Sequence, residues 1–112
     1  MHVDEKMVGD VAVVSLAGEM LFDDDDFVLQ QKISSLRLDG VNKIIIDLKR
    51  LNRINSRGLS ALLRAVRTMR ENGGDIRLAQ IDRHLNDLLA QTKLVQVFNT
   101  YESVGRAMAS YL

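Results

Sequence analysis

One serine stands out as a residue whose side chain could do chemistry. Ser56 lies in the stretch Asn55-Ser56-Arg57-Gly58, which joins a β-branched run to a leucine-rich segment. A serine at the start of a helix, just beyond a central strand, is presented to solvent. On its own this pattern is most often a helix cap. The alternative is that the function of the chain is read out at this serine.

The other chemically capable residues favour structural roles. Asp23-Asp24-Asp25-Asp26 could bind a divalent cation, since hard cations prefer carboxylates. Clustered aspartates before a helix are more often caps and first-turn charges that complement the helix dipole. His2 and His84 are isolated, with no second ligand at metal spacing. The chain has no cysteine, no phosphate-cradling glycine loop and no nucleophile–base pair. We therefore expect no enzyme activity, no cofactor and no metal.

The charge pattern bounds the partners. The 15 basic and 15 acidic side chains give a formal net charge of zero, whereas nucleic-acid binders usually carry a basic excess. Arg64, Arg67 and Arg70 form a basic stripe that we interpret as a solvated helix face. No apolar run approaches the roughly 20 residues that span a bilayer, and the first ten residues lack a signal-peptide pattern. We expect a cytoplasmic protein that does not bind nucleic acid directly and does not insert into a membrane.

Two elements must position Ser56. Ile44-Ile45-Ile46 is an unbroken β-branched run that ends at Asp47, and it predicts a strand buried on both faces. Lys49–Asn55 is predicted to be a short polar connection. A helix follows, because apolar residues then recur at three- and four-residue spacing. These residues are Leu59, Leu62, Leu63, Val66 and Met69.

The residues before this unit predict a hairpin and a helix. Val3, Glu5 and Met7 alternate with polar neighbours, and Val11–Leu16 is a second apolar run beyond a Gly9-Asp10 turn signal. The hairpin is expected to end at Ala17-Gly18-Glu19. Asp23–Leu38 then predicts a helix that Asp39-Gly40 closes. Its inner face is expected to carry Leu29, Ile33 and Leu36.

The residues after it continue the alternation. Beyond the break at Gly73-Gly74, Asp75–Ala79 predicts a short strand, and Asp82 can cap a third helix. Val95–Phe98 is predicted to be a short final strand or its remnant, and a last helix to begin at Asn99 or Thr100. The inward residues expected are Leu85, Leu88 and Leu89 on the third helix, and Val104, Ala107, Met108 and Tyr111 on the last.

At 112 residues the chain is one domain, expected over 1–112. Strands that alternate with helices imply right-handed crossovers onto a largely parallel sheet. The sequence therefore predicts an α/β fold: a mixed, mostly parallel sheet of four to five strands, with an N-terminal hairpin and about four helices.

Several of these features together resemble a STAS domain. They are the two-strand start that ends in Gly18-Glu19, the run Ile44-Ile45-Ile46-Asp47-Leu48, the serine–glycine turn that opens a leucine-rich helix, and Gly73-Gly74 followed by Ile76-Arg77-Leu78-Ala79. The resemblance covers essentially the whole chain. A free-standing domain of this length most resembles the anti-sigma factor antagonists.

The resemblance implies a phosphorylation switch. In the family, a serine in an Asp-Ser-Ser/Thr-Gly turn is phosphorylated by a partner kinase that is also an anti-sigma factor. The unphosphorylated protein binds that partner and frees the sigma factor, and a phosphatase resets the cycle. Ser56 falls on the phosphoacceptor position and Gly58 on the family glycine.

The resemblance also implies the partner surface. It would include Asn55, Arg57 and Gly58, with Arg53 beside the serine. An acidic residue near the aspartate cluster contributes in the family; Glu19 and Asp23 are the candidates here.

Two residues depart from the family pattern. Asn55 replaces the usual aspartate, and Arg57 replaces a second small hydroxyl residue. Asparagine and aspartate are similarly good N-caps, so Asn55 should cap the helix and leave the Ser56 hydroxyl free. The negative charge beside the acceptor oxygen is lost, which would reduce phosphorylation if a kinase uses that carboxylate.

Three functions from different classes follow. The first is an anti-sigma factor antagonist, a monomer or weak dimer, whose partners are an anti-sigma factor with serine-kinase activity and a serine phosphatase. The second is a constitutive STAS interaction module, such as a soluble subunit of a transporter or signalling complex, which Asn55 and Arg57 keep open. The third is a small flavodoxin-like enzyme that binds a ligand beyond the strand ends, for which no motif speaks.

Overall fold

The computed structural model describes residues 1–112 and shows one five-stranded sheet. Its strands lie in the order β1-β2-β3-β4-β5. β1 pairs antiparallel with β2, and every other pair is parallel. The predicted mixed, mostly parallel sheet with an N-terminal hairpin is confirmed. The strands are β1 (His2–Val8), β2 (Val11–Met20), β3 (Lys43–Ile54), β4 (Asp75–Ala79) and β5 (Thr100–Tyr101).

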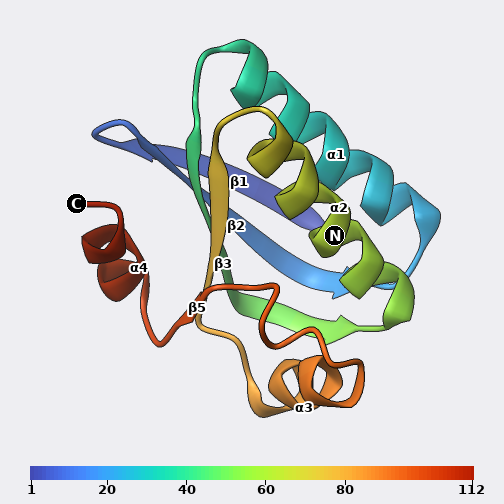
Figure 1. Cartoon of the computed structure of the whole chain (residues 1–112). Helices are drawn as coiled ribbons and strands as arrows, with labels where there is room; N and C mark the ends of the chain where they lie inside the picture. The colour runs from blue at the N-terminus through green and yellow to red at the C-terminus, as the bar shows by residue number, and fades with distance from the viewer.

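Four helices cover the sheet unequally. They are α1 (Asp23–Leu38), α2 (Ser56–Glu71), α3 (Arg83–Gln91) and α4 (Val104–Ser110). The two long helices, α1 and α2, lie side by side on one face, whereas α4 lies alone on the other (Figure 1). α3 sits at the end of the sheet towards which β3 runs. The α1–α2 face carries the larger hydrophobic core.

β3 is the strand around which both cores form. Ile44, Ile45 and Ile46 are all completely buried. Ile44 and Ile46 belong to the core beneath α1 and α2, whereas Ile45 belongs to the smaller core beneath α4. Alternating side chains of a strand point to opposite faces, so this central strand needs an apolar residue at every position. The predicted burial on both faces is confirmed.

The prediction that Lys49–Asn55 is a connection was wrong, because β3 continues to Ile54. The reason lies in its pairing with β2, whose register shifts twice, between Ser15 and Ala17 and between Gly18 and Glu19. Such bulges place an extra residue in one strand and break the two-residue alternation. Buried Leu48, Leu51 and Ile54 are consequently separated by pairs of exposed residues, which imitates a polar loop.

The prediction for the C-terminal strand and helix was also wrong in position. Val95–Phe98 forms a turn in which Phe98 is buried, and the short β5 follows at Thr100–Tyr101. The last helix begins at Val104, because the Ser103 hydroxyl accepts the Arg106 N–H at 3.0 Å and caps it. Val97 and Phe98 pack this turn against the core, and the segment does not form a strand.

Hydrogen bonds explain where α1 ends and how α4 is held against the sheet. α1 ends where Gly40 adopts a left-handed φ of +87° and donates its N–H to the Arg37 carbonyl, as predicted for a closing glycine. α4 is held by Tyr111, whose hydroxyl donates to the Ile44 carbonyl at 2.8 Å and the Asp75 carbonyl at 3.0 Å. Burial raises the pKa of the Tyr111 phenol well above its usual range.

Candidate functional site

Ser56 is the first residue of α2 and is exposed. The residue before it, Asn55, has an extended backbone, and its side-chain oxygen accepts the Gly58 N–H at 3.1 Å. Asn55 is therefore the N-cap, as predicted. The Ser56 hydroxyl makes no hydrogen bond within the chain, so it is free for another partner. The end of β3 and the start of α2 together hold it at the edge of the sheet.

Gly58 supports the site by allowing a close approach. A Cβ atom at this position would lie 2.4 Å from the Met20 carbonyl oxygen and 2.6 Å from Cγ1 of Ile54. Only glycine lets the first turn of α2 pack directly on the ends of β2 and β3. Because Gly58 is buried, its contribution to the surface is the position it gives to its neighbours.

Ser56 lines a shallow polar depression between α1 and α2, which we call the Ser56 hollow. It encloses about 210 Å³ and has no hydrophobic residue in its wall. The predicted residues Ser56, Arg57 and Asp23 meet here, and an Arg57 Nη1 lies 3.5 Å from an Asp23 carboxylate oxygen. The Arg57 and Asp23 side chains are 65% and 91% exposed, so water can readily replace either partner of this ion pair. The hollow is lined by Asp23, Asp26, Ser56, Arg57, Ser60 and Arg64.

Three residues of this hollow were not predicted as site residues: Ser60, Arg64 and Asp26. Ser60 and Arg64 follow Ser56 at four-residue intervals, and residues at that spacing share one face of a helix. Their recurrence at four-residue intervals after Ser56 is the feature of the sequence from which Ser60 and Arg64 could have been predicted. Asp26 joins them because its carboxylate accepts hydrogen bonds from Arg64 and from Gln30, and the Gln30 amide also donates to the Ala61 carbonyl. These bonds tie α1 to α2 beneath the hollow.

The predicted Arg53 and Glu19 lie outside the hollow and face each other. They are cross-strand partners at the ends of β3 and β2, and Arg53 Nη1 donates to Glu19 Oε2 at 3.2 Å. Both side chains are at least half exposed. The structure thus places four predicted partner residues in two groups, Asp23 and Arg57 in the hollow and Arg53 and Glu19 at the adjacent strand ends. The other two, Asn55 and Gly58, bond to each other in the turn that opens α2.

Three of the four clustered aspartates, Asp23, Asp25 and Asp26, have different partners. Asp25 Oδ2 accepts the backbone N–H groups of Leu21 and Phe22 at 3.0 and 3.1 Å, and Oδ1 accepts the Met1 amino group. Partial burial pushes the Asp25 pKa upward, but these donors outweigh it, so the pKa lies below its ordinary value. This is the cap role that the sequence favoured. No group of three or more His, Asp or Glu side chains is placed to hold a metal ion.

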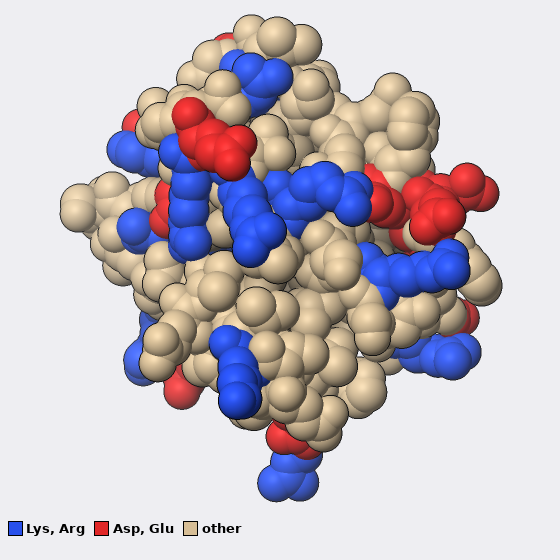
Figure 2. Space-filling view, turned by 45° about the vertical axis from the view of Figure 1, so that its right-hand side comes forward, with Lys and Arg blue, Asp and Glu red and all other residues tan.

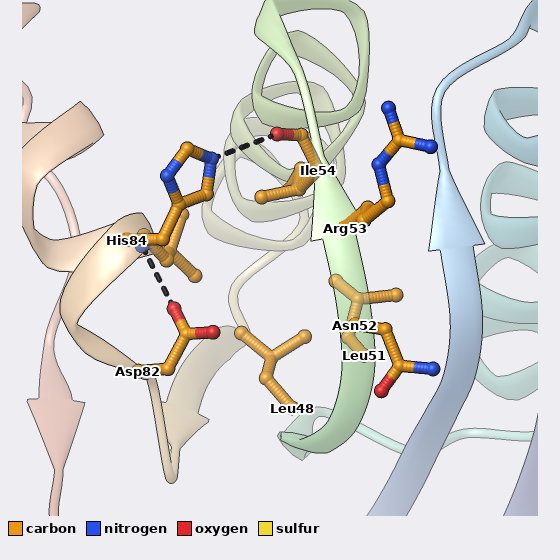
Figure 3. Close-up of a pocket in the computed structure, with 8 residues that line it drawn as sticks. Leu48, Leu51, Asn52, Arg53, Ile54, Asp82 and His84 are labelled. Carbon is orange, nitrogen blue, oxygen red and sulfur yellow. Dashed lines mark hydrogen bonds between the residues drawn. The ribbon is translucent and has the colours of Figure 1, made fainter.

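His84, on α3, contacts the end of β3 at the turn into α2. Figure 3 shows its ring reaching across from α3 to the Ile54 carbonyl, with Nε2 3.4 Å from that oxygen, while Arg53 points to the other side of β3. Asp82 caps α3 by accepting the Leu85 N–H at 2.8 Å, as predicted. The space between these groups is only about 10 Å³. It holds no more than a water-sized molecule.

Charges are unevenly spread over the surface that contains α2. The exposed residues of this helix include Arg57, Arg64, Arg67 and Arg70 against a single acid, Glu71. Figure 2 shows basic side chains gathered in a band across this face, with a separate acidic group at its right-hand edge. Two exposed aromatic side chains, Phe22 and Phe27, are 67% and 63% exposed at the start of α1. Arginine and phenylalanine are both enriched in protein interfaces, so this surface has a composition suited to binding a protein partner.

The fold and the exposed serine at the strand–helix junction can now be compared with known proteins. A family model, STAS domain, matches residues 2–107. The chain therefore belongs to the STAS domain family, which confirms the resemblance seen in the sequence. None of its helices is both long enough and apolar enough to cross a bilayer.

Within that family the chain is similar to named antagonists. It is 24% identical over 98 residues to the anti-sigma F factor antagonist of Paenibacillus polymyxa, covering 88% of this chain and 84% of that protein. The phosphorylated form of SpoIIAA, a Bacillus cell fate determinant, matches with a TM-score of 0.75 at 19% identity, over 99% of this chain and 100% of SpoIIAA.

A third relative comes from another setting. A sulfate transporter family protein of Wolinella succinogenes matches with a TM-score of 0.80 at 16% identity, over 94% of this chain and 88% of that one. At such identities the structural matches establish a shared fold.

Proposed function

We propose that this protein is an anti-sigma factor antagonist in a partner-switching pathway. In its unphosphorylated form it binds an anti-sigma factor that is also a serine kinase. Phosphorylation of Ser56 by that kinase releases it, and a serine phosphatase restores the binding form. The similarity to an anti-sigma F factor antagonist and to the anti-sigma factor antagonist SpoIIAA supports the class of function. The protein acts in the cytoplasm as a binding module without catalysis or cofactor, as a monomer or weak dimer.

The exposed, unbonded hydroxyl of Ser56 is the observation that carries this proposal. Because Asn55 supplies the cap, the serine oxygen can be modified without removing a bond that holds α2. A phosphoserine adds about −1.5 to −2 charges at neutral pH. A helix N-terminus favours such a charge, so α2 should remain folded. The switch then acts on the partner.

The surroundings of Ser56 set how the charge is felt. A phosphate there joins Asp23 and Asp26 in the hollow and faces Arg57 and Arg64. Like-charge contact with an acidic partner surface costs several kcal/mol, and each ~1.4 kcal/mol changes affinity tenfold. The partner surface comprises both groups of exposed residues around the serine. Its members are Glu19, Asp23, Arg53, Asn55, Arg57 and, through its packing, Gly58.

Phosphopeptide mass spectrometry on the chain isolated from its own cells, across growth and stress conditions, tests this function. We expect a phosphate on Ser56 that disappears in Ser56→Ala. Ser60→Ala is the matched control, because Ser60 lies in the same hollow one turn along α2; its phosphorylation level should equal that of the wild type. An unmodified Ser56 under every condition would refute the switch.

A constitutive interaction module is the second candidate. Asn55 and Arg57 favour it, because the residue before the serine carries an amide in place of a carboxylate and Arg57 is already paired with Asp23. The match to a sulfate transporter family protein is consistent with it. A chain that is never phosphorylated but co-purifies with one stable partner would support this candidate instead.

A further inference from the structure

The surface around Ser56 is assembled from two segments that are far apart in the sequence. One is the loop between β2 and α1, Leu21 and Phe22, which leads directly to Asp23. The other is the turn from Asn55 into α2. A single side chain bonds across them: the Asn55 Nδ2 donates to the Leu21 carbonyl at 3.0 Å, over a separation of 34 residues.

Asn55 uses both ends of its amide at once. Its oxygen accepts the Gly58 N–H within α2, and its nitrogen donates to Leu21 in the loop. A backbone carbonyl only accepts and a backbone N–H only donates, so this bridge needs one acceptor and one donor on the same short side chain. Asparagine provides both in the required order.

Aspartate and serine, two other common N-cap residues, do not offer the same bridge. An ionised aspartate only accepts hydrogen bonds, so one carboxylate oxygen would cap Gly58 while the other faced the Leu21 carbonyl oxygen without a proton between them. A serine would cap α2, and its hydroxyl can both accept and donate, but one oxygen atom would have to reach both the Gly58 N–H and the Leu21 carbonyl, for which the amide has two separate atoms. The amide therefore adds a second hydrogen bond, to the Leu21 carbonyl, which an N-cap alone does not provide.

Other contacts join α1 to α2, among them the exposed Arg57–Asp23 pair and the Arg64–Asp26 bond, but the Asn55 bond is the hydrogen bond from this turn to the backbone of the β2–α1 loop. On the loop side, Asp25 holds the N–H groups of Leu21 and Phe22 and so fixes the loop to its own helix. On the α2 side, His84 contacts the Ile54 carbonyl, and Gly58 packs on Met20. The Asn55 bond joins the two halves directly beside Ser56.

We infer that Asn55 is a positioning residue whose amide clasps the β2–α1 loop to the first turn of α2, so that Phe22, Asp23, Ser56 and Arg57 form one preformed surface for the partner. The inference rests on the proposed function for what the surface binds, and on the two hydrogen bonds for how it is held. Preformed surfaces lose less conformational entropy on binding. This chain thus has a specific use for asparagine at the position before its serine.

Backbone NMR of the full chain tests the clasp without a partner. Asn55→Ser keeps an N-cap and removes the bridge, so the amides of residues 21–23 should shift and exchange about 3- to 10-fold faster, as expected for one partly exposed hydrogen bond. Asn52→Ser is the matched control, since the Asn52 side chain is exposed and makes no hydrogen bond. Its loop amides should stay at their wild-type positions.

Asn55→Asp gives a signature that a purely structural change would not. At neutral pH its loop should be released as in Asn55→Ser. Once the new carboxyl is protonated it regains a donor, so the loop signals should return towards wild-type positions as the pH falls through about 4. Wild type and Asn55→Ser contain the same Asp25 and report its titration separately. Loop signals that are unchanged in Asn55→Ser, or that do not recover in Asn55→Asp, would overturn the clasp.

Binding completes the test, with the purified anti-sigma factor kinase as the probe. Asn55→Ser, and Asn55→Asp at neutral pH, should bind it several-fold more weakly than wild type. Asn52→Ser should bind it as tightly as wild type does. A loosened loop with unchanged affinity would overturn the positioning role. Absence of phosphate on wild-type Ser56 would count against the proposed switch alone, because the NMR results do not depend on it.

Discussion

Two regions of the molecule contain paired acidic and arginine side chains that serve different roles. Near α4, Asp75 accepts hydrogen bonds from Arg70 and Arg77 at 3.0 and 3.3 Å, and Arg77 stacks on the Tyr111 ring at 4.0 Å. Asp75 and Arg77 are only 23% and 20% exposed. At the Ser56 hollow, Asp23 and Arg57 are 91% and 65% exposed and 3.5 Å apart.

Burial explains the difference. A partly buried, multiply bonded ion pair leaves a costly unpaired charge if one member is removed, so the Asp75 cluster (Arg70, Asp75, Arg77 and Tyr111) holds the fold. An exposed pair contributes about 0–1 kcal/mol and can exchange partners readily. The Ser56 surface is therefore suited to recognition because little stability depends on its charges. Changes at the two regions should separate stability from binding.

Gly58→Ala should have the largest effect, because the site depends on a packing contact as well as on exposed charges. The new Cβ would meet the Met20 carbonyl at 2.4 Å, and overpacking of this kind costs about 1–3 kcal/mol. Gly105→Ala in α4 is the control, since its Cβ would meet Ser103 Oγ at an ordinary 3.8 Å. That variant should be stabilised by up to about 1 kcal/mol. Urea unfolding measures both; equal stabilities would contradict the close approach.

Tyr111→Phe tests the structural region. It removes the hydroxyl that donates to the Ile44 and Asp75 carbonyls but keeps the ring beneath Arg77. Loss of a buried hydrogen-bonding group should cost about 1–3 kcal/mol in the free energy of unfolding. Tyr101→Phe is the comparison, because the Tyr101 hydroxyl makes no hydrogen bond. Phosphate occupancy on Ser56 should be unaltered in both, and a change in it would mean that the two regions are coupled.

Asp25→Asn tests how acid affects the loop beside the Ser56 surface. The folded pKa of Asp25 lies below its unfolded value of about 3.9. Its contribution to stability is therefore complete at neutral pH and is lost as the pH falls through the folded pKa. Thermal unfolding at pH 7 and in steps below pH ~4 should show a shallower acid loss for Asp25→Asn than for wild type. Asp24→Asn, whose carboxylate makes no hydrogen bond, should follow the wild-type curve.

The sequence carried the architecture because its strongest signals are local. The Ile44–Ile46 run is entirely apolar because that strand is buried on both faces, and the leucines of α2 recur at helical spacing because one face of that helix is buried. The errors arose where long-range pairing decides. The register shifts against β2, at which β3 carries the extra residues, disguise residues 49–54 of β3, and β5 exists only because Leu78 and Ala79 lie beside Thr100 and Tyr101.

The site divides in the same way. The cap role of Asn55 and the exposure of Ser56 follow from position on one helix, and the structure confirms both. The bond from Asn55 to Leu21 joins residues 34 positions apart, and nothing in the local sequence indicates it. Ser60 and Arg64 could have been found from four-residue spacing, whereas Asp26 enters the hollow only because α1 packs on α2.

The smallest effect is expected from the Arg53–Glu19 pair, and it is the most informative about the difference between the two regions. A double-mutant cycle with Arg53→Gln and Glu19→Gln should give a coupling energy for folding of about 0.2–1 kcal/mol that falls with added salt. Partner affinity measured on the same four proteins should change more than stability does. A coupling energy for folding well above about 1 kcal/mol would mean that exposed charges at the strand ends hold the fold, and the division between the structural and recognition regions would fail.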